Sequence, residues 1–318
     1  MRLRQLVRLG KLGLVAGGAV AVGAAAIGAG GAQAAGPAIV PHAFVPAVSH
    51  RPLFSLGANQ SSNWSGYNQG ALEKNTNFQG VAGDWVVPTA TEKVAGEAEY
   101  SSTWVGIGGG CIDAGCATTD STLIQTGTEQ DAGNTGGPAY YGWWEIIPAP
   151  SFVATDANGN TLPVSAGDAM HATVTQTAPQ VWTILLQDTT KGWTFTQTVP
   201  YSSSYATAEW IEETPVVISN SGSVTVGPLP KLSTVHIDNA QTAAAAGGPL
   251  AGAGLVPGEE IQLVDPNSGQ VLATPSSPDP DADGFNDCTF ATTCAAPSGD
   301  LGTSGGGGTG HHKLRRAR

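Results

Sequence analysis

Trp193-Thr194-Phe195-Thr196-Gln197-Thr198-Val199 places a threonine at every second position, between larger side chains. The side chains of a β-strand point to opposite faces in turn, so this period of two predicts a strand with one buried and one exposed face. Similar short runs recur about every ten residues from Asn59 onwards, separated by clusters of Gly, Asn, Asp, Ser and Pro. Such spacing is typical of an all-β domain.

The runs predict strands at residues 63–67, 79–87, 100–107, 122–126, 140–147, 170–177, 180–188, 193–199, 206–213, 223–226, 232–237, 260–265 and 270–273. About a dozen strands in one domain indicate two packed antiparallel sheets, a β-sandwich of the concanavalin or jelly-roll kind. The alanine-rich stretch 239–247 is expected to form a short helix or a loop.

Residues 1–35 have the pattern of a secretory signal, with a basic start, an Ala/Gly/Val-rich stretch and the small-residue cleavage site Ala32-Gln33-Ala34. The alternative is an uncleaved membrane anchor, for which the stretch is long enough but poor in Leu, Ile and Phe. The signal predicts a secreted, extracellular protein that has no contact with the membrane after the signal is removed.

Three segments follow the signal. Residues 36–57 are rich in Pro, Ala and Val and are expected to be an extended pro-segment or linker, and residues 58–295 to form the folded domain. Residues 296–318 are Gly-rich and end in a basic cluster. They cannot bury enough apolar surface to fold, so we expect a flexible tail.

The charge of the domain is strongly negative. Residues 58–295 hold 24 acidic side chains and four basic ones, whereas the whole chain has a net charge of −12 because its ends are basic. Nucleic acid is excluded as a partner, since binding it requires positive charge against the phosphates. Such a surface suits a protein that works at acid pH, where carboxylates protonate, or one adapted to salt.

The four cysteines are an even number in a chain with an export signal, which favours disulfides. They are Cys111, Cys116, Cys288 and Cys294. Of the three possible pairings, the local one is favoured because its partners, 111 with 116 and 288 with 294, are close in sequence. A four-cysteine zinc site is the alternative.

Several hydrolase motifs are missing. The sequence has no His-Glu-x-x-His helix and no pair of Asp-Thr/Ser-Gly loops. Its domain contains only the histidines His171 and His236, which we interpret as ordinary strand residues, so an acid–base group would be a carboxylate. Glu209 and Glu213 share one face of a predicted strand but lie roughly 13 Å apart. A catalytic partner must therefore come from another strand.

Four stretches resemble, in the same order, the motifs of the glutamic peptidases, or eqolisins. They are Asn63-Trp64-Ser65-Gly66, Thr103-Trp104-Val105-Gly106-Ile107-Gly108, Leu123-Ile124-Gln125-Thr126-Gly127 and Ala208-Glu209-Trp210-Ile211-Glu212-Glu213. Two supporting stretches, 85–88 and 140–145 with Pro148, also match. The resemblance covers residues 60–240, with weaker similarity to 290, and the ordered set is specific although each motif is short.

The resemblance implies a catalytic Gln/Glu pair on the concave face of one sheet of a two-sheet fold. Carried over by motif, the pair is Gln125 and Glu213. The implied enzyme is an acid endopeptidase, insensitive to pepstatin, in which the carboxylate takes a proton from water and the amide stabilises the oxyanion. No metal or organic cofactor is required, and we expect a monomer that acts on polypeptide substrates.

The matched motifs also contain the candidate substrate-binding residues, for which core packing is the alternative. They are Trp64, Trp104, Tyr141, Trp143 and Glu145. At two positions the chain departs from the fungal members of the family, which carry aspartates where this sequence has Gly108 and Tyr141. Those aspartates resemble groups that tune the pair, so their loss bears on the pH optimum and on activity itself.

A calcium loop is the alternative reading of one acidic stretch. Asp279, Asp281, Asp283 and Asp287 follow its spacing, but Phe290 stands at the position of the usual glutamate. We expect an acidic turn before the last strand. Two further functions remain open from the sequence: a carbohydrate-binding sandwich without catalysis, with exposed tryptophans as sugar platforms, and a degenerate, inactive family member.

Overall fold

The structure, a computed structural model, describes residues 47–52, 55–57, 59–133, 137–218, 224–299 and 301. The predicted signal at 1–35 lies outside these residues, as do 36–46 and the end of the predicted tail. Within the described part, the one helix is α1 (Ala71–Lys74), and no helix there is long and apolar enough to cross a membrane. The all-β prediction is confirmed.

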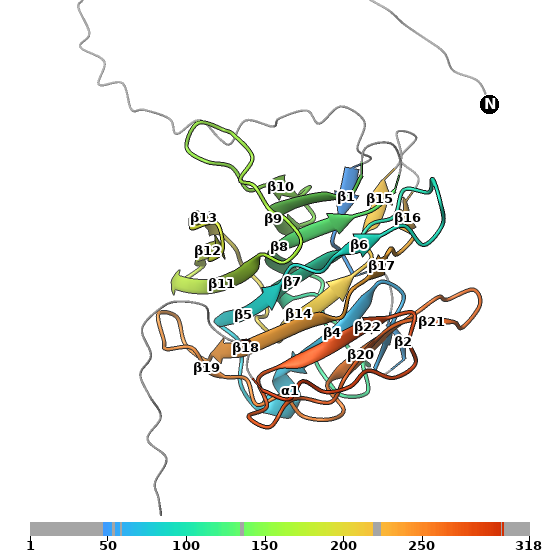
Figure 1. Cartoon of the computed structure of the whole chain (residues 1–318). Helices are drawn as coiled ribbons and strands as arrows, with labels where there is room; N and C mark the ends of the chain where they lie inside the picture. Colours follow the sequence, from blue (N-terminus) through green and yellow to red (C-terminus); the bar gives the residue numbers. More distant parts are fainter. Residues whose placement is uncertain are drawn as a thin grey trace, which may run out of the picture. The chain divides into compact units, whose positions relative to one another are not determined.

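The first sheet carries the candidate site. Its strand order is β10-β9-β8-β7-β14-β4-β20, and Figure 1 shows β14 between β7 and β4. These strands are β4 (Trp64–Gly70), β7 (Ser102–Gly108), β8 (Leu123–Asp131), β9 (Ala139–Ile147), β10 (Phe152–Val153), β14 (Thr207–Glu213) and β20 (Glu260–Val264).

The second sheet has the order β13-β12-β11-β5-β18-β22-β21-β20, so β20 joins the two sheets at one edge. Its other strands are β5 (Gly80–Val86), β11 (Ala169–Ala178), β12 (Val181–Asp188), β13 (Trp193–Pro200), β18 (Val235–Ala243), β21 (Val271–Pro275) and β22 (Phe285–Thr289). The strands in these two orders are antiparallel to their neighbours, as a sandwich of this kind predicts, and only the short pairing of β20 with β3 (Gln60–Ser61) is parallel among the described residues.

Short strands complete the fold. They are β1 (Ala47–Ser49), β2 (Ser55–Gly57), β3 (Gln60–Ser61), β6 (Ala90–Thr91), β15 (Val216–Ile218), β16 (Val224–Val226), β17 (Lys231–Leu232) and β19 (Ala251–Gly252). A separate sheet of order β1-β15-β16 places residues 47–49 beside the chain that follows β14.

The expectation of a helix or loop at 239–247 is wrong for its first half. β18 runs to Ala243 and pairs with β5, with a bulge between Asp238 and Gln241 that Asn239 accommodates at a φ of 52°. A strand held on both sides by neighbours gains packing and ladder hydrogen bonds, and these override the weak preferences of an alanine-rich stretch.

The hydrophobic core lies between the two sheets. Tyr67, Val105, Ile124 and Trp210 point inward from the first sheet, each at most 1% exposed, and meet side chains of the second sheet such as Trp85. Alternate residues of the same strands face the other way. β4, β7, β8 and β14 are nevertheless buried along their whole length, so the outer face of the first sheet is covered as well.

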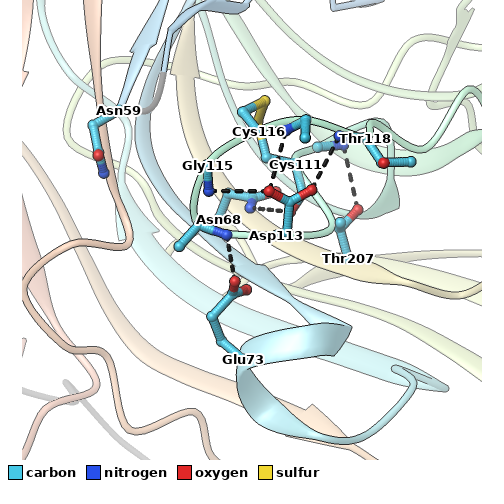
Figure 2. Close-up of a disulfide and its surroundings, with 12 residues drawn as sticks. Asn59, Asn68, Glu73, Cys111, Asp113, Gly115, Cys116, Thr118 and Thr207 are labelled. Atoms are coloured by element: carbon cyan, nitrogen blue, oxygen red, sulfur yellow. Dashed lines mark hydrogen bonds between the residues drawn. A yellow bond between two sulfur atoms is a disulfide. The ribbon is translucent and has the colours of Figure 1, made fainter.

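Two disulfides join Cys111 to Cys116 and Cys288 to Cys294, which confirms the local pairing. Figure 2 shows the first, in a loop that borders the outer face of the first sheet. The carboxylate of Asp113 closes this loop by accepting hydrogen bonds from the backbone N–H groups of Gly115 and Thr118, both at 3.0 Å.

Candidate active site

The outer face of the first sheet is covered by the chain's own residues 48–52. β1 pairs with β15, and the chain then crosses the sheet, with Val48, Ser49 and His50 each at most 9% exposed. The hydroxyl of Ser151 donates to the carbonyl of Val48 at 3.4 Å, and the hydroxyl of Ser49 donates to Glu145 at 3.0 Å. Part of the predicted pro-segment is thus packed into the candidate site.

Gln125 lies on β8 beneath this segment and is fully buried. Its side-chain Nε2 donates to the backbone carbonyl of His50 at 3.1 Å and to Oε2 of Glu145, directly opposite on β9, at 3.0 Å. Its Oε1 has no partner among the described residues. The amide therefore presents a donor to a peptide carbonyl and keeps an acceptor that a water could use.

Glu213 ends β14 and is also fully buried. Its Oε2 accepts from the indole N–H of Trp104 at 2.7 Å and its Oε1 from Nδ2 of Asn63 at 2.9 Å. The same Nδ2 donates to the carbonyl of Arg51 at 2.9 Å. Burial raises the pKa of Glu213 well above its ordinary value, against the opposing effects of the His50 charge and the Trp104 hydrogen bond.

Gln125 and Glu213 lie on the same face but not in register. Across β7, Gln125 faces Gly106, which in turn faces Glu209, so these three positions form one row. Glu213 lies four residues further along β14, in the row of Ser102 and Glu129. The two candidate catalytic side chains are therefore diagonal to each other. The inserted segment contacts Gln125 directly and is connected to Glu213 through Asn63.

The remaining predicted residues line the same face. Trp143 stacks on the imidazole of His50, with ring centroids 3.5 Å apart, and donates to the hydroxyl of Ser102. Trp64 meets Trp104 edge to face at 5.0 Å. Tyr141 packs against this group from β9. Trp144, which follows Trp143, points into the core instead, against Phe152.

Three residues of the site were not predicted from the sequence. Glu129 lies four residues after Gln125 on the same strand. Because side chains alternate along a strand, the sequence already places Glu129 and Gln125 on the same face. Asn63 is part of a matched motif, next to Trp64. His50 carries no sequence signal, because nothing in residues 36–57 indicates that this segment returns to the sheet.

Gly108 explains one departure from the family pattern. Its backbone has a φ of +96°, and a Cβ at this position would lie 2.0 Å from the carbonyl oxygen of Thr122. Only glycine fits this backbone, so an aspartate here would require a different local path. Tyr141, the second departure, stands opposite Glu129 on the neighbouring strand.

The residues of the alternative calcium reading are only partly brought together. Asp279 and Asp283 meet Asp238 of β18, with one carboxylate oxygen of each within 4.8 Å of the others. Asp281 is exposed, and Asp287 lies on β22 opposite Val235. The turn that was expected before the last strand is present, since backbone N–H of Asp279 donates to the carbonyl of Gly284.

A cleft of about 570 Å³ continues from the buried site. Its lining includes Arg51, Pro52, Trp64, Ile261 and the Cys111–Cys116 loop. The inserted segment is thus fully enclosed at His50 and enters the open cleft at Arg51 and Pro52.

Residues 62–281 match the model of the peptidase A4 family. No curated protein matches the sequence. Scytalido-glutamic peptidase with a transition state analog inhibitor shares the fold at a TM-score of 0.52 and 20% identity, over 72% of this chain and 98% of that one. The same enzyme with a peptide based analog gives 0.51 over the same shares, also at 20% identity. Aspergilloglutamic peptidase from Aspergillus niger aligns at 0.45 and 24% identity, over 60% and 99% of the chains.

Proposed function

The chain belongs to the peptidase A4 family, and we propose that it is a secreted acid endopeptidase in which Gln125 and Glu213 activate water against the peptide bond. Membership of the family supports a peptidase, a hydrolase of peptide bonds. One observation carries the finer proposal: the amide of Gln125 donates to the carbonyl of a peptide that lies in the site, at 3.1 Å.

The proposed reaction uses these groups as follows. A water molecule attacks the carbonyl carbon while the carboxylate of Glu213 takes its proton. The N–H of Gln125 stabilises the negative charge that develops on the carbonyl oxygen. Glu213 then gives the proton to the leaving nitrogen, the C–N bond breaks, and a carboxyl and an amino terminus are released.

Glu213 can take a proton from water only when it is ionised. Burial raises its pKa, whereas the charge of His50 and the hydrogen bond of Trp104 favour the ionised form. Trp104 and Asn63 hold the carboxylate at 2.7 and 2.9 Å, which fixes its direction.

Because residues 48–52 occupy the site, we propose that they must leave before other substrates can bind. The expected route is proteolytic cleavage within the 36–57 segment at acid pH. In the uncut chain, Trp64, Trp104 and Trp143 are at most 2% exposed, so they cannot serve as sugar platforms while residues 48–52 remain in place.

Incubation of the secreted protein with a denatured protein at pH 2–5 tests the function. We expect peptides to form in the presence of pepstatin and of a chelator. Glycan retention without cleavage would favour the carbohydrate-binding sandwich, and neither cleavage nor retention would favour a degenerate family member.

A further inference from the structure

Residues 48–52 lie in the site as a bound peptide would. The backbone N–H of His50 donates to Glu145 at 3.0 Å, its carbonyl accepts from Gln125 at 3.1 Å, and the carbonyl of Arg51 accepts from Asn63 at 2.9 Å. Gln125 therefore meets the carbonyl of the His50–Arg51 bond, and the next carbonyl along the chain is connected through Asn63 to Glu213.

The side chain of His50 fills a closed pocket. Its ring lies flat on Trp143, with an interplanar angle of 6°, and has no exposed surface. Nε2 lies 2.8 Å from Oε1 of Glu129, and Nδ1 lies 3.3 Å from Oε2 of Glu145. Both ring nitrogens therefore meet carboxylate oxygens, an arrangement that suits the doubly protonated, cationic imidazole.

The charge balance of this pocket supports a cation. Burial alone would lower the pKa of His50, but the hydrogen bond and charge of Glu129, followed by those of Glu145, raise it to about 10. An uncharged side chain in the same place would leave two buried carboxylates without a counter-charge, which is costly. A flat ring also gains the stacking and cation–π contact with Trp143 that a linear ammonium group makes less well.

We propose that this pocket selects histidine on the amino side of the cleaved bond, and that His50–Arg51 is the bond at which the enzyme cuts its own chain. The inference rests on the proposed function. Water adds to the carbonyl carbon of His50, the bond to the nitrogen of Arg51 breaks, and the proton passes through Glu213 to that nitrogen. The new amino terminus at Arg51 stays attached to the domain and can move into the cleft of about 570 Å³ that Arg51 and Pro52 line.

The first test uses the secreted full-length protein at pH 3–5, followed by N-terminal sequencing and intact mass. A new terminus at Arg51 is expected, and the Glu213→Gln protein should keep its original terminus. A stable terminus at any other position, with no cut after His50, would overturn the assignment of the bond.

The second test compares synthetic peptides of residues 44–57, with His50 kept or replaced as His50→Phe, His50→Lys or His50→Ala. We expect kcat/KM to fall roughly 30-fold or more for the neutral replacements, as when one partner of a buried charge pair is removed. Equal kcat/KM for the His and Ala peptides would refute selection by this pocket.

Pocket variants separate selection from general damage. Glu129→Gln should reduce the preference for His over Phe, whereas Glu97→Gln, an exposed carboxylate elsewhere, should leave it unchanged. An unchanged preference in Glu129→Gln would count against the pocket.

A denatured protein, digested in parallel, distinguishes the two proposals. Cuts that show no enrichment of His before the cleaved bond would remove the present inference and leave the proposed function standing. No cut in any substrate would remove both.

Discussion

Glu209, rather than Glu213, stands in direct register with Gln125, through the single glycine Gly106 on the strand between them. The two glutamates share a strand and a face, and burial raises the pKa of both. They differ in their surroundings. Glu213 meets Trp104 and the Asn63 amide that also holds the inserted segment, whereas Glu209 lies under the Gly110 turn.

This difference gives the first prediction. Glu213→Gln should lower kcat by about 10²–10⁴-fold, because it removes the proposed base, whereas Glu209→Gln should change kcat only a few-fold. Each purified variant is assayed on a denatured protein and checked by circular dichroism. The reverse order of losses would transfer the role of base to Glu209.

The second prediction concerns the side-chain amide of Gln125. Gln125→Ala should lower kcat by about 10²–10³-fold with a smaller change in KM, because the hydrogen bond to the developing oxyanion matters most in the transition state. Steady-state kinetics separate the two constants. A rise in KM alone, at full kcat, would show that Gln125 only helps to bind the substrate.

The third prediction is a shift in pH dependence. The Trp104 indole lowers the pKa of Glu213 by hydrogen bonding to its charged form, so Trp104→Phe should raise that pKa. Since the base acts when ionised, the rising limb of kcat/KM against pH should move to higher pH, by up to about one unit.

Trp143→Phe provides the matched control for that experiment. The Trp143 indole donates to Ser102 and not to Glu213. The rising limb of kcat/KM against pH should therefore stay at the same pH, even if the absolute rate changes. If both variants move the limb equally, the shift does not arise from the hydrogen bond of Trp104.

The fourth prediction concerns the charge of His50 in the uncut protein. In the Glu213→Gln protein, which keeps its segment, the imidazole should titrate with a pKa of about 10, compared with about 6.5 in the free 44–57 peptide. Nuclear magnetic resonance of the ring protons follows both. Titration near 6.5 in the intact protein would mean that His50 is not held by Glu129 and Glu145.

The raised pKa of His50 also makes the stability of the uncut protein depend on pH. Because the folded pKa of His50 lies above its unfolded value, its contribution is complete below about pH 6.5 and is lost as the pH rises through about 10. The thermal midpoint of the Glu213→Gln protein should therefore approach that of the Glu213→Gln/His50→Gln protein as the pH rises from 7 to 10.5.

The sequence was a good guide where each element depends on its own pattern. The alternation at 193–199 correctly predicted β13, because a period of two is a property of the segment itself. The disulfides were predicted correctly for a similar reason, since the two cysteines of each pair are close in sequence. The 239–247 stretch was misjudged, because the pairing of β18 with β5 is decided by a strand about 160 residues earlier in the chain.

The candidate site was predictable only in part, for a similar reason. Gln125 and Glu145 occur in motifs whose strands are consecutive, so their meeting follows from a simple hairpin. The diagonal placement of Glu213 depends on the register of β14 against β7, which no local pattern fixes. His50 and Glu129 are 79 residues apart in sequence, and they meet because the segment around His50 crosses the sheet. The composition of that segment does not indicate this crossing.

The pairing of β1 with β15 has a consequence for what this enzyme can digest. β15 lies between β1 and β16, so the departure of residues 47–49 leaves its backbone N–H and C=O groups free along one side, immediately after Glu213. An incoming polypeptide can add there as a new strand, through main-chain hydrogen bonds that are indifferent to side chains. Only a chain that can adopt an extended form satisfies that edge, so we expect the proposed peptidase to cut unfolded proteins and to spare stably folded ones.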